Sequence, residues 1–127
     1  MRKFAAALTL VALSGCATGG PSPQESYRAA FQRAVAAGQC TGPEVREMWG
    51  EYNGWYDIAS NVQRRNWGTL ADALVTQGDT FQRMGCPAVA KVSYDEVLKR
   101  FIGPAYGAYR DRAIVGLDDL RTQKYKR

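Results

Sequence analysis

The chain has 127 residues, with 17 Lys or Arg, 12 Asp or Glu and a formal net charge of +5 at pH 7. This length allows one domain with a single modest core. The sequence contains no histidine, so it lacks the usual general base, the usual activator of serine or cysteine nucleophiles and the commonest zinc ligand. The composition therefore disfavours an enzyme, and we expect no catalytic residues, no metal and no other cofactor.

The first residues have the pattern of an export signal. Two basic residues at 2–3 precede an uncharged apolar run over 4–13, which is shorter than the roughly 20 residues that span a bilayer. The Leu-Ser-Gly-Cys sequence at 13–16 resembles the lipobox of bacterial lipoproteins. The resemblance implies that residues 1–15 are a signal peptide and that Cys16 receives diacylglycerol and becomes the new amino terminus.

The same resemblance implies a location for the mature protein. Loss of the signal peptide lowers the net charge from +5 to +3, and an exported, mildly basic protein is not expected to bind nucleic acid. In lipoproteins of enteric-type bacteria, aspartate after the lipidated cysteine retains the protein in the inner membrane. Here that residue is Ala17, which implies the periplasmic face of the cell outer membrane, or the inner or plasma membrane where no outer membrane exists. Residues 16–22 form a tether that holds the domain within roughly 25 Å of the lipid.

Two helices are predicted after the tether. A Ser-Pro-Gln-Glu capping pattern at 22–25, followed by apolar residues at three- and four-residue spacing, predicts a helix over residues 23–37. A second capping pattern at 41–44 opens an apolar stripe that continues to Val62. The turn signal Asn-Gly at 53–54 lies inside this stripe. Because the periodicity continues across it, we expect one helix with a weak point.

The third predicted helix begins near Asn66 and ends at the Gly-Cys-Pro stop signal at 85–87. The next helix is predicted to be capped by Ser93 and to reach the Gly-Pro pair at 103–104. There it either kinks or ends and restarts with proline at its first position. Residues 88–92 also fit an extended segment, but one short strand has nothing to pair with.

The last predicted helical segment continues to Leu120. Residues 121–127 contain four basic side chains and no acid, which is typical of a frayed tail. Such a tail either touches anionic headgroups or is solvated. The helical periplasmic domain is therefore predicted to cover residues 23–120.

Two cysteines, Cys40 and Cys86, remain once Cys16 is assigned to lipid. In an oxidising compartment an even pair predicts a disulfide, and the alternative is two buried free thiols. Each cysteine follows the end of a predicted helix, and the first and third helices of an up-down bundle finish at the same pole. A bridge over this loop contributes roughly 4 kcal/mol. The predicted fold is all-α, a small up-down bundle of four to five helices with one disulfide.

Aromatic residues are concentrated in the second predicted helix. Trp49, Tyr52 and Tyr56 share one helical face, where they form either a core stripe or a partner groove, and spacing favours the core. Trp67 is a further member of this aromatic group. Trp55 lies to one side of the shared face and is the better candidate for an exposed anchor that binds a partner.

The same helix carries an acidic ridge formed by Glu44, Glu47 and Glu51. Paired carboxylates can act as acid and base on a glycan, but a solvated face near a helix amino terminus is the favoured interpretation. Together with Trp55, Glu47 and Glu51 are the candidate partner-binding residues.

The plan of the chain is a lipid anchor, a short tether, a small disulfide-linked helical domain and no catalytic set. It resembles that of the helical pilotin lipoproteins, which bind a secretin segment and escort it to the outer membrane. The resemblance covers the plan and no motif. We therefore expect a non-catalytic protein that acts as an assembly, chaperone or structural partner of an envelope complex. The alternative is an envelope inhibitor or immunity protein against an incoming enzyme or phage, and a third hypothesis is a glycan hydrolase.

Overall fold

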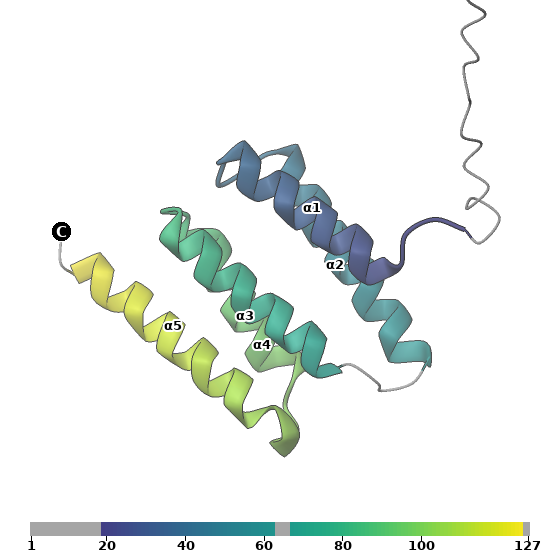
Figure 1. The fold of residues 1–127 in the computed structure, drawn as a ribbon. Coiled ribbons are helices and arrows are strands. Elements are labelled where there is room, and N and C mark those ends of the chain that lie inside the picture. The colour runs from purple at the N-terminus through teal and green to yellow at the C-terminus, as the bar shows by residue number, and fades with distance from the viewer. Residues whose placement is uncertain (1–18, 63–66, 126–127) are drawn as a thin grey trace, which may run out of the picture.

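The computed structural model describes residues 19–62 and 67–125, and these form helices and turns with no strand. The elements are α1 (Pro23–Ala37), α2 (Pro43–Val62), α3 (Trp67–Arg83), α4 (Pro87–Arg100), the 3₁₀ helix η2 (Pro104–Tyr106) and α5 (Gly107–Tyr125). Consecutive α-helices alternate in direction, so α1, α3 and α5 run the same way (Figure 1). The predicted all-α up-down bundle is confirmed. The predicted signal peptide and Cys16 lie outside the described residues.

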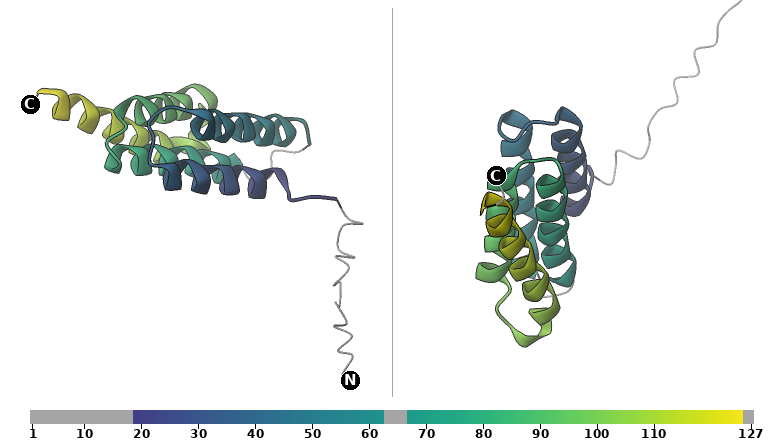
Figure 2. Two further views of the ribbon diagram at one scale, coloured as in Figure 1. Left: turned by 90° about the horizontal axis from the view of Figure 1, so that it is seen from above. Right: turned by 90° about the vertical axis from the view of Figure 1, so that its left-hand side faces the viewer.

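Two packed units make up the bundle. α1 and α2 form an antiparallel hairpin, whereas α5 packs against both α3 and α4 in a three-helix unit. Figures 1 and 2 show the hairpin lying beside this unit. Aromatic side chains fill the space between the units, with ring centroids 5.3 Å apart for Tyr56 and Trp67 and 6.4 Å apart for Phe31 and Phe81. The boundary between the units is therefore made mainly by side chains, with few close backbone contacts.

The predicted bounds of α1 are confirmed. Ser22 Oγ accepts a hydrogen bond from the Glu25 backbone N–H at 3.2 Å, and Pro23 occupies the first turn, where no N–H is needed. Gly38 closes the helix with a φ of +65°, and its N–H donates to the carbonyl of Val35. The sequence pattern and the local backbone geometry therefore agree at both ends of this helix.

α2 runs without a break through the Asn-Gly pair at 53–54, as its apolar periodicity predicts. The Asn53 side chain is exposed, and its Oδ1 accepts a hydrogen bond from Arg100 Nη2 of α4 at 2.8 Å. In a loop, an asparagine side chain often bonds to nearby backbone groups. The Asn53 side chain instead contacts the three-helix unit.

α4 begins earlier than the sequence pattern predicts. It starts at Pro87, so Ser93 lies inside the helix and does not cap it, and residues 88–92 are helical. A proline directly after the disulfide-bonded Cys86 supplies a stronger start, because its fixed φ suits the first helical position. Ser93 is fully buried and donates to the carbonyl of Val89 at 2.8 Å. Its hydroxyl is therefore satisfied within the helix.

α4 ends at Arg100, shortly before the Gly-Pro pair at 103–104, and η2 restarts the helical path with Pro104 in its first turn. α5 then runs to Tyr125, so the prediction of a frayed tail is wrong for residues 121–125. The last two residues of that predicted tail lie outside the described part. Arg121 pairs with Asp118 one turn earlier, an i, i+3 contact that supports the helix where the sequence suggested it would end.

Close packing of α4 against its neighbours depends on two glycines. A Cβ at Gly78 of α3 would lie 2.5 Å from the ring of Tyr94, and a Cβ at Gly116 of α5 would lie 2.3 Å from it. The Tyr94 ring therefore occupies space that only glycine leaves free, and its hydroxyl donates to Asp79 Oδ1 at 2.5 Å. The largest fully buried side chains are Tyr52, Tyr94, Phe81, Phe101, Met48, Leu70 and Leu74.

The predicted disulfide joins Cys40 and Cys86, with an S–S distance of 2.05 Å and a Cα–Cα distance of 5.1 Å. It links the α1–α2 turn to the α3–α4 turn, because α1 and α3 end at the same pole. We call this end the disulfide pole. At the opposite end, which we call the open pole, α1 and α3 begin and α4 turns into α5 (Figure 1). The poles thus differ in how the two units are joined.

Candidate functional site

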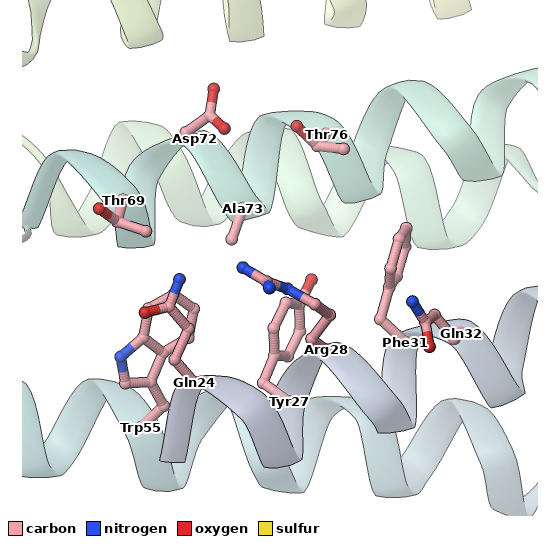
Figure 3. A pocket seen from close by; sticks show the side chains of 10 residues that line it. All are labelled: Gln24, Tyr27, Arg28, Phe31, Gln32, Trp55, Thr69, Asp72, Ala73 and Thr76. Atoms are coloured by element: carbon pink, nitrogen blue, oxygen red, sulfur yellow. The ribbon is translucent and has the colours of Figure 1, made fainter. Parts of the chain in front are cut away.

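A groove of about 250 Å³ lies between the hairpin and the three-helix unit, on the side where α1 and α3 begin. It has an apolar floor and a polar rim, and its lining comes from three helices (Figure 3). The lining residues are Gln24, Tyr27, Arg28, Phe31 and Gln32 of α1, Trp55 of α2, and Thr69, Asp72, Ala73 and Thr76 of α3. Because these helices belong to both units, the shape of the groove depends on how the units meet.

Three aromatic rings form the floor. The Tyr27 ring lies 5.6 Å from the Trp55 ring and 6.0 Å from the Phe31 ring, measured between centroids. Trp55 is only 8% exposed, so the prediction of an exposed anchor is wrong. α2 packs against α1 and also meets α3 through side chains, so its buried arc is wider than the single face used for the prediction. Trp55 nevertheless contributes to the groove, as part of its floor.

The shared face of α2 packs as a core stripe. Tyr52 is fully buried, and the partly buried Trp49 and Tyr56 pack against the core. The Tyr52 hydroxyl donates to the carbonyl of Leu70 in α3 at 2.9 Å. Of the two interpretations left open by the sequence, the core stripe is therefore confirmed.

A buried relay of hydrogen bonds fixes the position of the groove floor relative to the helices behind it. The Tyr27 hydroxyl donates to Gln77 Oε1 at 2.8 Å, and Gln77 Nε2 donates to Ser93 Oγ at 2.9 Å. Burial raises the pKa of the Tyr27 hydroxyl well above its ordinary value, so it stays protonated and acts as a donor. The relay connects α1, α3 and α4, and a satisfied polar network of this kind fixes one arrangement of the helices.

The rim offers neutral hydrogen-bonding groups and two charged side chains. Gln24 and Gln32 supply amides from α1. Arg28 lies on the α1 side and Asp72 on the α3 side (Figure 3). Asp72 also pairs with Arg112 of α5 at 3.2 Å. The groove therefore combines apolar contact with several donors and acceptors.

The predicted acidic residues lie elsewhere. Glu47 pairs with Arg33 of α1 at 2.6 Å, with both side chains about half exposed, and the half-buried Glu51 is not among the lining residues. Trp55 is thus the one predicted partner-binding residue that reaches the groove. The polar lining of α1 and α3 was missed because it flanks the apolar stripes and becomes a rim only when the two units pack together.

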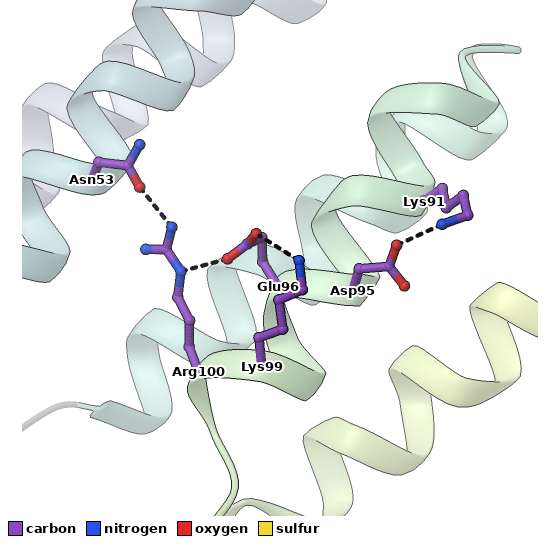
Figure 4. A network of polar contacts seen from close by, with 6 residues as sticks. All are labelled: Asn53, Lys91, Asp95, Glu96, Lys99 and Arg100. Carbon is purple, nitrogen blue, oxygen red and sulfur yellow. Dashed lines mark hydrogen bonds and ion pairs between the residues drawn. The ribbon is translucent and has the colours of Figure 1, made fainter.

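A second polar cluster ties the units together at the open pole (Figure 4). The Arg100 guanidinium lies 4.6 Å from the centre of the Tyr56 ring. Its Nε donates to Glu96 Oε2 at 2.7 Å, and its Nη2 donates to Asn53 Oδ1 at 2.8 Å. The Glu-Arg spacing at 96 and 100 is visible in the sequence, but the cross-helix partners in α2 are not. Arg100 therefore acts as a clamp between α2 and α4.

Within residues 19–62 and 67–125, no group of three or more acidic or cysteine side chains is placed to hold a metal ion. None of the described helices is both long and apolar enough to cross a membrane. Comparison with protein-family models, with curated proteins and with solved structures finds no significant match.

Proposed function

We propose that this protein is a lipid-anchored, non-catalytic component of the bacterial cell envelope that binds a segment of a protein partner. The observation that carries the binding role is the groove between the hairpin and the three-helix unit. Its volume of about 250 Å³ is below the roughly 300 to 1,000 Å³ of typical small-molecule sites. It suits a few side chains that protrude from a partner.

The chemistry of the lining supports a peptide ligand. The aromatic floor offers apolar contact for the partner's side chains, and aromatic residues supply much of the binding energy at interfaces. The amides of Gln24 and Gln32 and the hydroxyls of Thr69 and Thr76 can bond to main-chain groups of an extended or helical segment. Such a role is that of an assembly, chaperone or structural partner.

The anchor is supported by the sequence alone. The charged start, apolar run and Leu-Ser-Gly-Cys sequence predict that Cys16 carries lipid, with the outer membrane favoured by Ala17. Cys16→Ser should leave an unprocessed or soluble precursor, detected by its mass and by fractionation of the envelope. A Cys16→Ser variant that is processed and membrane-bound as before would contradict the anchor.

Crosslinking in living cells tests the groove. A photoreactive amino acid in place of Gln32, at the rim, should give one covalent adduct with an envelope protein. Thr76→Trp fills the groove and should abolish this adduct, whereas Thr122→Trp, a matched change of an exposed threonine on α5, should leave it intact. Loss with both variants or with neither would contradict binding in the groove. An adduct that forms only when cells meet a foreign enzyme or phage would instead support the inhibitor or immunity alternative.

A further inference from the structure

The turn between α4 and α5, residues 101–106, is unusually apolar for an exposed turn. No charged side chain occurs between Arg100 and Arg110. Ile102 is 76% exposed, the highest value among the exposed large hydrophobic residues of the described chain. Pro104 and Ala105 are exposed beside it. Turns of soluble proteins are normally polar, so this composition indicates a specific neighbour. We call residues 101–106 the apolar turn.

The apolar turn is held firmly in place. The buried Phe101 ring lies 5.7 Å from the Trp67 ring and 5.6 Å from the Tyr106 ring. Arg110 Nη1 donates to the carbonyls of Phe101 and Gly103, at 2.8 and 2.6 Å. The Gly103 carbonyl also accepts the N–H of Tyr106 at 3.0 Å. Ile102 is therefore presented on a fixed support.

The same hydrogen bonds lower the free-energy cost of moving the backbone of the apolar turn from water into a lipid environment. Backbone groups without partners are expensive in a lipid environment, because no water is present there to replace the lost hydrogen bonds. Here Arg110 and the Tyr106 N–H satisfy carbonyls of the turn from within, and Pro104 has no N–H to satisfy. Tyr106 and Tyr109 are partly exposed on the α5 side, and tyrosine is enriched at membrane interfaces.

The place of the apolar turn in the fold adds a second argument. It lies at the open pole, where α1 also begins and where residues 19–22 lead away from the bundle (Figures 1 and 2). The proposed lipid on Cys16 precedes Ser22 by six residues, which span at most roughly 20 to 25 Å. An anchor of this length keeps the open pole, where α1 begins, within reach of the membrane.

We propose that the apolar turn inserts into the interface of the phospholipid membrane that holds the anchor, with Ile102 as the inserted side chain. The inference rests on the proposed lipid anchor but not on the groove. The apolar turn carries no charged side chain of its own, so the part that enters the interface is uncharged. Insertion therefore depends on apolar burial and changes little with salt. The contact fixes the orientation of the domain on the membrane.

A single introduced thiol tests this arrangement. Cys40 and Cys86 are bonded to each other and the proposed lipid occupies Cys16, so Ile102→Cys can be labelled alone with a polarity-sensitive fluorophore. The mature lipidated protein is placed in vesicles of phosphatidylethanolamine and phosphatidylglycerol. The label should show blue-shifted emission and quenching by nitroxide-bearing lipid chains, and both should persist in high salt. Val92→Cys, at a 46% exposed apolar residue in the half of α4 that is nearer the disulfide pole, is the matched control and should show neither.

Three results would overturn the inference, and flotation of the vesicles tells them apart. If the protein floats with the vesicles but the Ile102 label stays in water, the insertion is wrong and the anchor stands. If the label is shielded in native envelopes but not in vesicles of lipid alone, the apolar turn faces a protein. If the protein does not float, the lipid anchor fails and the insertion fails with it.

Discussion

The two poles of the bundle join the same two units in different ways. At the disulfide pole a covalent bond links the α1–α2 turn to the α3–α4 turn. At the open pole the chain passes from α2 of the hairpin to α3 of the three-helix unit, and apart from this connection the units are held there by non-covalent contacts, through hydrogen bonds such as Tyr27 to Gln77 and Tyr52 to Leu70 and through the Arg100 clamp. Non-covalent contacts of this kind can rearrange, whereas the disulfide cannot. The groove and the apolar turn both lie away from the disulfide, toward the open pole.

The difference suggests a division of roles. A bond at one pole keeps the two units together when the other pole adjusts to a partner segment or a membrane. Regions that bind ligands are drawn from the less stable parts of a fold, so we expect the open pole to be the less stable of the two. Four measurements test how strongly the poles differ.

The largest expected effect follows from removing the disulfide. The double variant Cys40→Ser, Cys86→Ser frees a loop that spans 46 residues, and the chain-entropy model gives a loss of roughly 4 kcal/mol in the free energy of unfolding. Urea unfolding followed by circular dichroism measures it. A loss below about 1 kcal/mol would mean that the side-chain contacts between the units are sufficient and that the poles do not differ in the way described.

The positions of the cysteines show how far the sequence predicts the fold. Their spacing from helix ends predicted the bridge and the common pole of α1 and α3, because both depend on local helix signals. Ser93 shows the opposite case, because Ser-Tyr-Asp-Glu at 93–96 matches a capping box although α4 begins at Pro87. The proline at the first position gave an earlier start than the capping box, and Ser93 is instead buried, where it accepts a hydrogen bond from Gln77. Helix existence follows from sequence periodicity, whereas the choice between two competing start signals does not.

The second effect is a loss of stability in alkali. Burial raises the pKa of Tyr27 and Tyr52 in the folded protein, whereas in the unfolded chain tyrosine ionises near its ordinary pKa of about 10. Above that pH the unfolded state holds fewer protons than the folded state, so stability falls as pH rises and is unaffected below about pH 9. The loss is roughly 1.4 kcal/mol per tyrosine for each pH unit above 10, or about 3 kcal/mol for the pair at pH 11.

Urea titrations between pH 8 and pH 11 measure this alkaline loss. Tyr27→Phe serves as the control, because it removes one of the two ionisable hydroxyls at the boundary between the units and should make the loss less steep. A stability that is flat with pH up to 11 would mean that these hydroxyls are accessible to solvent and that the open pole is already loose.

The groove was less predictable than the fold, and Trp55 shows why. Its position beside the main apolar face of α2 indicated exposure, but α2 meets a helix of each unit and Trp55 is buried between them. The sequence did not single out Arg28 or Thr76, because each lies beside the apolar stripe of its own helix. Both line the groove only when the two units pack together. To predict a site formed between two units, one must know how the units are placed relative to each other. Sequence periodicity gives no information on this placement.

A smaller effect is expected from breaking the buried relay. Gln77→Leu leaves the Tyr27 hydroxyl without its acceptor in a buried position, and an unsatisfied buried polar group costs about 1 to 3 kcal/mol. Gln123→Leu, at an exposed glutamine of α5, is the matched control and should change the free energy of unfolding by less than about 0.5 kcal/mol. The double variant Tyr27→Phe, Gln77→Leu should regain part of the loss, because both partners are then apolar. No regain would show that Gln77 acts through packing and not through the relay.

The smallest effect is expected at Glu47, which pairs with Arg33 toward the disulfide pole. Both side chains are about half exposed, so solvent and side-chain entropy offset most of the attraction, and Glu47→Gln should cost less than about 0.5 kcal/mol. A double-variant cycle with Arg33→Gln, measured by urea unfolding, gives the coupling free energy between the two side chains.

The Glu47→Gln variant also tests the sequence-based prediction that Glu47 binds a partner. Because Glu47 is not among the residues that line the groove, the adduct formed from position 32 should survive Glu47→Gln. Loss of the adduct with unchanged stability would move the binding surface from the groove to the exposed face of α2.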